Sequence, residues 1–200
     1  MTRFGFKLII CVVLAVATGL VYFALRSGDP IYTFHEWISP GRFHRYDNLI
    51  RSVAARHSID PMLVKAVVWR ESRFDPHKFG MAGERGLMQV REAAAKEWAH
   101  QNQVDNFRVE ELFDPKKNLE AGSWYLQRAM QHWRHQSEPI AFALAEYNAG
   151  PSRAQRWAGG EDAGAISGDA FRKNINFPNT RNYVDSIIER YNFYKRRGRM

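Results

Sequence analysis

The stretch DPMLVKAVVWRESRFDP, residues 60–76, decides how this chain folds. It opens with an Asp-Pro pair, in which the aspartate can cap a helix and the proline fits the first helical position. From the proline to Glu71, the only charged residues are Lys65, Arg70 and Glu71 itself. A helix that is apolar nearly all round is typically buried. The stretch therefore predicts a central helix that carries a carboxyl group at its C-terminal end.

On an ideal helix, Glu71 lies between Val64 and Val67, and Leu63 and Phe74 lie close by on the same side. Most helical glutamates are solvated, and that interpretation stays open at this point. Burial and the negative end of the helix dipole would both disfavour the ionised carboxyl and raise its pKa. A carboxyl that is protonated near neutral pH is a general acid, so Glu71 is a candidate catalytic residue.

Most of the remaining chain also has helical spacing of apolar residues. The pattern predicts further helices over residues 45–57, 90–100, 114–133, 138–148 and 179–194. Glycine, asparagine and proline cluster between them, at 80–86, 148–151 and 159–168. No two-residue alternation is long enough for a substantial sheet, so the predicted fold class is mainly α.

The N-terminus carries the clearest targeting signal. Residues 8–25 form 18 positions without a charge, which is at the lower limit for spanning a bilayer. Arg3 and Lys7 precede them and would keep the N-terminus on the cytoplasmic side. Ala15–Ala17 resembles a signal-peptidase site, but the apolar run continues past it. An uncleaved signal anchor is therefore favoured over a cleaved signal peptide.

These patterns divide the chain into four parts. The predicted parts are a signal anchor (or signal peptide) at 1–28, a linker at 29–41, a catalytic domain at 42–195 and a basic tail at 196–200. A domain of this length has room for one sizeable core. With the N-terminus on the cytoplasmic side, the domain is predicted to lie on the outer side of the membrane, anchored there or soluble if the leader is removed.

Charge and cysteine content limit the classes of function. The net charge is +8, which suggests an anionic partner such as an acidic polymer or a lipid surface. Nucleic acid is a poor candidate, because the basic residues are scattered and follow no recognition motif. Cys11 is the only cysteine, so neither an intrachain disulfide nor a thiolate metal site is possible. His132 and His135 lack a convincing third ligand, and no metal is predicted.

Three motifs accompany the glutamate, and each is weak alone. Gly86-Leu87-Met88-Gln89 combines a residue that allows close backbone approach with an amide side chain. Tyr147-Asn148 precedes a glycine-proline turn, and Tyr183 lies near the start of the last helix.

Together and in order, the motifs resemble the lytic transglycosylases with a soluble-lytic-transglycosylase-type (goose-lysozyme-like) catalytic domain. The matching pieces are Glu71-Ser72, Gly86 to Gln89, Ala145 to Gly150 and Thr180-Arg181-x-Tyr183-Val184. The resemblance covers about residues 46–191. The chain departs from the family in having Asn179 where a glutamate is frequent, and KFGMAGER where a serine-rich turn is usual.

The resemblance implies a lysozyme-like helical domain that cuts peptidoglycan between N-acetylmuramic acid and N-acetylglucosamine. Glu71 would protonate the glycosidic oxygen and then accept the proton of the muramic 6-hydroxyl, which gives a 1,6-anhydro end. Substrate-binding roles are implied for the remaining motif residues: Ser72, Gly86, Met88, Gln89, Tyr147, Asn148 and Tyr183. No cofactor is implied, and a further partner in the cell envelope stays unknown.

Two alternatives remain at this point. A goose-type lysozyme would share Glu71 but hydrolyse the bond, which requires a second carboxylate to activate water. Asp75, Glu84 and Glu146 are the candidates for that role. The other alternative is a wall-binding or assembly protein that keeps the fold without the chemistry.

Overall fold

The computed structural model describes residues 3–26, 34–35, 38–160 and 164–198. The chain divides into two compact units, and the boundary in the sequence falls between His44 and Arg45. The described helices of the first unit are α1, Arg3–Arg26, and α3, Pro40–His44. Within the described residues, no helix combines the length and the apolar character that crossing a bilayer needs. Residues 29–33 and 36–37 of the predicted linker lie outside the described residues.

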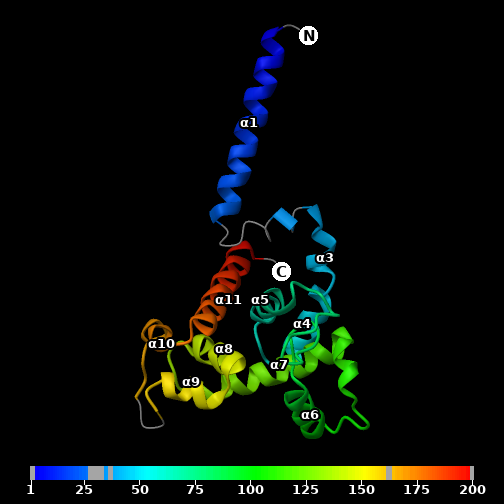
Figure 1. Cartoon of the computed structure of the whole chain (residues 1–200), viewed down its shortest axis with the longest axis vertical. Helices are drawn as coiled ribbons and strands as arrows, with labels where there is room; N and C mark the ends of the chain where they lie inside the picture. The colour runs from blue at the N-terminus through cyan, green and yellow to red at the C-terminus, as the bar shows by residue number, and fades with distance from the viewer. Residues whose placement is uncertain (1–2, 27–33, 36–37, 161–163, 199–200) are drawn as a thin grey trace. The chain divides into compact units, whose positions relative to one another are not determined.

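The second unit is mainly helical. Its described elements are α4 (Asp47–Arg56), α5 (Pro61–Ser72), α6 (Glu92–Gln101), the 3₁₀ helix η1 (Val109–Phe113), α7 (Pro115–His132), α8 (Pro139–Ala149), α9 (Pro151–Trp157), α10 (Gly168–Asn174) and α11 (Pro178–Arg197). In Figure 1, α7 runs across this unit and α11 is steeply inclined to it. Between the described residues, β pairing is limited to two isolated bridges, Phe79 with Arg85 and Arg85 with Val90. The predicted mainly α class is confirmed.

Two of the helices begin as their Asp-Pro pairs predict. The Asp60 side chain accepts a hydrogen bond from the Met62 N–H at 2.8 Å, and Pro61 occupies the first position of α5. Asp114 does the same for α7, where it accepts from the Lys117 N–H at 2.9 Å. Each cap satisfies a backbone donor that the first turn leaves unpaired.

Helix α5 is buried, as its composition predicts. Val64 and Val67 are fully inaccessible to solvent, and α5 packs against α4 and α11. Helix α8 packs against α7, α9, α10 and α11, and its Phe142 and Leu144 are also fully buried. These two apolar helices form the centre of the unit, so the residues at their C-terminal ends are held by the core.

Helix α5 ends abruptly just beyond Glu71. Arg73 and Phe74 both adopt left-handed backbone conformations, with φ of 52° and 62°. Two successive non-glycine residues in this region are uncommon and cost conformational energy. The buried Phe74 side chain fixes the turn to the core. The chain therefore reverses direction directly after the candidate catalytic residue.

A buried ion pair joins α5 to α4. The Lys65 ammonium lies 2.7 Å from a carboxylate oxygen of Asp47, and the lysine side chain is fully buried. The same ammonium lies 5.3 Å from the ring centroid of Tyr194 on α11. Burying a charge is costly unless it is paired, so this contact fixes how the three helices meet.

Helices α9 and α10 and the 3₁₀ helix η1 were not predicted. The sequence around Gly150-Pro151 was interpreted as a turn that ends a helix, and it does end α8. Pro151 is also the first residue of α9, because a proline there has no N–H to leave unpaired. All three elements are short, and short elements carry weak periodicity.

Candidate active site

Glu71 lies on the last turn of α5 and is only partly exposed. Burial raises the pKa of its carboxyl to about 7. The pKa is lowered by a hydrogen bond from Tyr183 and by the positive charges of Lys78 and Arg70, but less than burial raises it. The charge of Glu84 raises it further. The predicted rise in the pKa of Glu71 is thus confirmed in direction, and burial is its largest cause. Near neutral pH the carboxyl can both donate and accept a proton.

Tyr183 contacts the carboxyl from α11. Its O–H donates to Glu71 Oε1 at 2.7 Å, and the residue is 3% exposed. Burial, followed by the nearby charge of Glu71, raises the pKa of Tyr183 well above its ordinary value. The phenol therefore remains protonated and orients the carboxyl through a fixed hydrogen bond. Arg70 lies over the tyrosine ring, with its Cζ 5.6 Å from the centroid.

The loop from Gly86 to Gln89 follows α5 and is tightly folded. Gly86 has a φ of +73°, and a Cβ at this position would lie 2.3 Å from Nδ2 of Asn118, so only glycine fits. Gln89 has a φ of 48°, and its amide N–H₂ donates to the carbonyls of Lys78 and Gly86, both at 3.0 Å. The side-chain amide thus closes the loop on itself.

Asn118, which was not predicted from the sequence, holds this loop against α7. The residue is fully buried. Its Oδ1 accepts from the Met88 N–H at 2.7 Å, while its Nδ2 donates to the carbonyls of Arg85 at 2.7 Å and Leu112 at 2.8 Å. The available signal was that Asn118 lies about one turn before Ala121 and Gly122 on the buried face of α7, because a buried amide must find partners.

Tyr147 and Asn148 extend from the C-terminal end of α8. The Tyr147 O–H donates to the Met88 carbonyl at 2.9 Å, and its ring meets Tyr125 edge to face at 5.9 Å. Asn148 is exposed, and its Oδ1 accepts from the Thr180 hydroxyl at 2.8 Å. Burial is the largest cause that raises the pKa of Tyr147 well above its ordinary value, and electrostatic interactions with Glu71 and Tyr125 raise it further.

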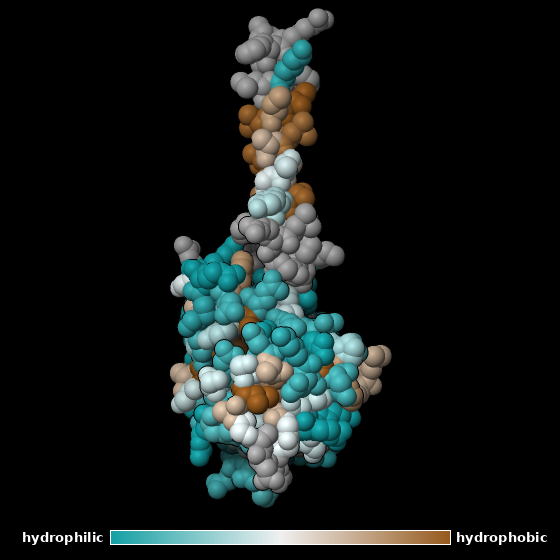
Figure 2. Space-filling view, turned by 90° about the vertical axis from the view of Figure 1, so that its left-hand side faces the viewer, coloured by the Kyte–Doolittle hydropathy of each residue, from teal (hydrophilic) through white to brown (hydrophobic). Residues whose placement is uncertain are grey.

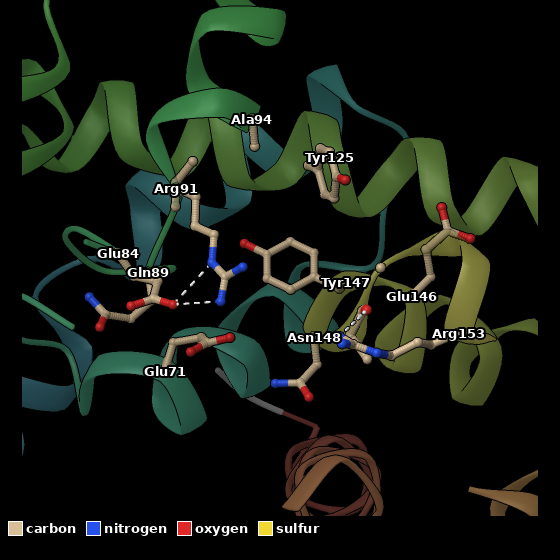
Figure 3. A pocket seen from close by; sticks show the side chains of 13 residues that line it. Glu71, Glu84, Gln89, Arg91, Ala94, Tyr125, Glu146, Tyr147, Asn148 and Arg153 are labelled. Carbon is tan, nitrogen blue, oxygen red and sulfur yellow. Dashed lines mark hydrogen bonds and ion pairs between the residues drawn. The ribbon is translucent and has the colours of Figure 1, made fainter. Parts of the chain in front are cut away.

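Four of these residues, Glu71, Gln89, Tyr147 and Asn148, line a cavity of about 280 Å³. Figure 3 shows the Glu71 carboxyl pointing into the space between Gln89 and Tyr147. Glu84, Arg91, Glu146 and Arg153 also line it. The cavity is polar and has the size of a small ligand-binding cleft, so it can hold a sugar-sized group beside the carboxyl.

Two further carboxylates line the cavity, and both are engaged. Glu84 Oε1 accepts from Nε and Nη2 of Arg91, at 3.0 Å and 2.9 Å. Burial would raise the pKa of Glu84, but hydrogen bonds from its own N–H, from Arg91 and from the Ala82 N–H outweigh it, and the pKa is lowered. Glu84 is therefore ionised and held by an arginine.

Glu146 is the other engaged carboxylate. It is 4% exposed, and its Oε2 lies 2.7 Å from both His132 Nδ1 and Trp133 Nε1. Asp75, the third acid considered for a lysozyme, accepts from the His77 N–H at 2.9 Å and is not part of the cavity lining. Among the described residues, no group of three His, Cys, Asp or Glu side chains could hold a metal ion.

The residues predicted for the site have three different placements. Glu71, Gln89, Tyr147 and Asn148 line the cavity. Three others support it from outside the lining: Tyr183, Gly86 and Met88. Ser72 does neither, because its buried hydroxyl donates to the Val68 carbonyl of its own helix at 3.3 Å.

Comparison with known proteins relates this geometry to one family. The transglycosylase SLT domain matches residues 48–168. A soluble lytic murein transglycosylase from Salmonella typhimurium is 30% identical over 151 residues, which are 75% of this chain and 23% of the relative. A membrane-bound lytic murein transglycosylase F from Desulfosudis oleivorans is 34% identical over 120 residues, 58% of this chain and 24% of the relative.

A solved structure agrees. The 70 kDa soluble lytic transglycosylase from Escherichia coli superposes with a TM-score of 0.69 and 28% identity, over 76% of this chain and 24% of that one. The likeness confirms the predicted lysozyme-like helical fold. The chain spans only about a quarter of the length of these relatives. Because the family match covers more than half of the sequence, the chain belongs to the transglycosylase SLT domain family.

Proposed function

We propose that this protein is a peptidoglycan lytic transglycosylase that cleaves the bond between N-acetylmuramic acid and N-acetylglucosamine and leaves 1,6-anhydro ends. The observation that carries the proposal is the single carboxyl of Glu71, whose burial raises the pKa to about 7 at the wall of a polar cavity. The two other carboxylates of that wall are held by Arg91 and by His132 and Trp133. One acid is therefore available for proton transfer.

One acid is enough when the nucleophile belongs to the substrate. Protonated Glu71 gives its proton to the glycosidic oxygen as the bond to the muramic anomeric carbon breaks, and N-acetylglucosamine leaves with a hydroxyl. The N-acetyl group of the muramic residue shares the positive charge, as in substrate-assisted glycosidases. The muramic 6-hydroxyl then attacks the anomeric carbon, and Glu71, now a carboxylate, takes its proton. No water is consumed, and the enzyme returns to its starting state.

The neighbouring side chains have supporting roles in this proposal. Tyr183 orients the carboxyl through the 2.7 Å hydrogen bond to Oε1. Gln89 presents its amide oxygen and Asn148 its amide N–H₂ to the sugar hydroxyls and N-acetyl groups, because the other half of each amide is bonded within the protein. Tyr147 packs beside them, and its hydrogen bond to the Met88 carbonyl joins α8 to the loop. Ser72 supports the end of α5 rather than the sugar.

Mass analysis of the digestion products tests the proposal. Purified peptidoglycan digested by the protein should release muropeptides that end in 1,6-anhydro-N-acetylmuramic acid. Products that are one water heavier would identify a lysozyme and require a second catalytic acid. Absence of cleavage in a zymogram, together with retained binding to the wall, would instead identify a non-catalytic binder.

We also propose that residues 8–25 anchor the chain in the inner membrane, with the domain at 42–195 in the periplasm. In α1 the described large apolar side chains from Ile9 to Tyr22 are exposed. Figure 2 shows them as a largely brown surface, while the visible face of the second unit is mostly hydrophilic. Relatives of both kinds exist, since one is named soluble and another membrane-bound.

The mature N-terminus decides between anchoring and release. If the anchor is retained, the protein purified from membranes begins at residue 1 or 2 and resists extraction by salt and alkali. A sequence that begins at Thr18 would contradict the anchor and indicate a soluble periplasmic enzyme, since it follows the Ala15–Ala17 site.

A further inference from the structure

Arg153 differs from the other charged groups of the cavity. Arg91 gives two N–H groups to Glu84, and Glu146 accepts from His132. Between the described residues, no ion pair joins Arg153 to a carboxylate, although the residue lines the same cavity as Glu71. The wall of the cavity thus carries one guanidinium whose charge the surrounding described side chains do not balance.

The Arg153 side chain is exposed, and two contacts orient its guanidinium. Its Nη1 donates to the Ala149 carbonyl at 3.2 Å, and its Cζ lies 5.2 Å from the ring centroid of Phe177. The Phe177 ring is in turn packed edge to face on Trp157 at 5.5 Å. In Figure 3, Arg153 reaches from α9 toward Tyr147 and Asn148. An arginine has five N–H donors, so this arrangement leaves several for a ligand in the cavity.

A planar guanidinium held in this way suits an oxyanion that accepts two parallel hydrogen bonds. Apart from the acid Glu71 and the engaged groups Glu84, Arg91 and Glu146, the polar side chains of the wall are neutral amides and phenols, which suit sugars. A glycan strand of peptidoglycan carries both chemistries, because each muramic residue has a lactyl group that ends in a carboxylate or in a peptide with carboxylates of its own. The ligand that fits Arg153 is therefore the acidic part of the strand.

We propose that Arg153 binds a carboxylate carried by the muramic residue beside the cleaved bond, and so makes the enzyme selective for charged strands. The inference rests on the proposed function and adds to it the acidic group that the site recognises. The carboxylate is either that of the lactyl group itself or one on the attached peptide.

The experiment compares three strands with the full-length protein in detergent. The first strand keeps its peptides, the second has been stripped by an amidase and exposes lactyl carboxylates, and the third is the stripped strand converted to neutral amides with carbodiimide and ammonia. The variants are Arg153→Gln and Arg153→Lys. Arg156→Gln is the matched control, because Arg156 is an exposed arginine of the same helix and is absent from the cavity lining.

The wild type should cleave at least one carboxylate strand with a kcat/KM about tenfold above that of the neutral strand, the effect of one charge-assisted contact. Arg153→Gln should remove this preference by slowing cleavage of that carboxylate strand alone. Arg153→Lys should keep part of the preference for that strand, and Arg156→Gln should keep all of the preference. The strand on which the loss occurs, stripped or peptide-bearing, identifies which carboxylate is bound.

Other outcomes overturn the inference. If the wild type cleaves charged and neutral strands equally well, the inference fails before any variant is tested. It also fails if Arg153→Gln slows cleavage of charged and neutral strands to the same extent. A loss shared by Arg156→Gln would mean general attraction between a basic protein and an acidic polymer. If the wild type cleaves none of the strands, the proposed function fails first, and that result is distinct from cleavage without preference.

Discussion

At the scale of single residues, the behaviour of Glu71 follows from opposing influences on one carboxyl. Burial raises its pKa to about 7, and the Tyr183 hydroxyl acts against that increase. Without burial the carboxyl would be ionised at neutral pH and unable to protonate a leaving group. With burial alone it would hold its proton too strongly to return as a base. By lowering the raised pKa, the tyrosine therefore allows the carboxyl both to donate and to accept a proton in the proposed cycle.

Glu71→Gln should abolish cleavage while the fold and wall binding survive. The amide keeps the size of the side chain but cannot transfer a proton. General acid–base catalysis contributes about 10²–10⁴-fold, and one group performs both transfers here, so the loss should reach the upper end of that range. Wall-clearing assays, melting curves and binding to insoluble peptidoglycan on the same samples check this. Clearing within about tenfold of the wild type would rule out Glu71 as the acid.

Tyr183→Phe should move the alkaline limb of the pH profile to higher pH. The hydroxyl lowers the pKa of Glu71, so its removal raises that pKa. Activity that depends on the protonated carboxyl is lost as pH rises through its pKa, so in the variant the loss should occur at higher pH. The measurement is kcat/KM against pH for both proteins. A limb that stays in place or moves to lower pH would contradict the role of Tyr183.

The sequence predicted some of these residue roles and not others. Glu71 could be identified because its place in an apolar helix already implies burial. Glu84, Asn118 and Arg153 could not, because their partners or the cavity they line come from other elements and only the fold brings them together. Ser72 matches its motif, yet the helix directs its hydroxyl to the backbone.

At the scale of elements, Asn118 is the joint between α7 and the loop that carries Gln89. Asn118→Asp should lower stability by about 1–3 kcal/mol, because a carboxylate cannot donate to the Arg85 and Leu112 carbonyls. The loop should shift, and kcat should fall more than KM rises. Asn48→Asp is the control, since Asn48 is exposed and its Oδ1 only accepts, from Arg51. Equal kcat values for the two variants would leave Asn118 without a positioning role.

The pair of Lys65 and Asp47 makes a second prediction at this scale. Lys65→Met removes the ammonium that lies 2.7 Å from the buried Asp47 carboxylate, and should cost about 3 kcal/mol of unfolding free energy. Adding Asp47→Leu should return much of that loss, because two apolar side chains can replace a buried pair. Chemical denaturation of both variants measures the difference. Lys96→Met, which breaks the exposed pair with Glu92, should have a far smaller effect.

Helix starts were predictable where a local signal exists, as in the Asp-Pro pairs before α5 and α7. Such caps act within a few residues and depend little on the rest of the fold. Helices α9 and α10 have seven residues each and only two fully or largely buried positions apiece. Their stability comes mainly from packing against other elements, which no short pattern in the sequence reports.

At the scale of the whole molecule, the raised pKa of Glu71 affects stability as well as catalysis. The pKa is about 7 in the folded protein and near 4.5 when unfolded, so the folded state binds the proton more tightly between these values. Stability from this group is fully present below pH 4.5 and is lost as pH rises through 7. Glu71→Gln has no such dependence.

Melting curves from pH 4.5 to 8 test this linkage. The difference in stability between Glu71→Gln and the wild type should grow in favour of the variant across this range, by on the order of 2 kcal/mol. A constant difference would mean that the pKa of Glu71 is ordinary in the folded state. The same samples serve the cleavage assay, so loss of fold and loss of chemistry remain separable.

The hydrogen bond between Tyr183 and Glu71 joins residues 112 positions apart, so it can form only after the last described helix has been made. A ribosome makes α5 early and α11 last among the described helices, so a growing chain carries its acid long before the group that tunes it. The Glu71–Tyr183 contact is therefore complete only when α11 has packed against α5, and an incomplete chain lacks the tuned acid that the proposed function requires.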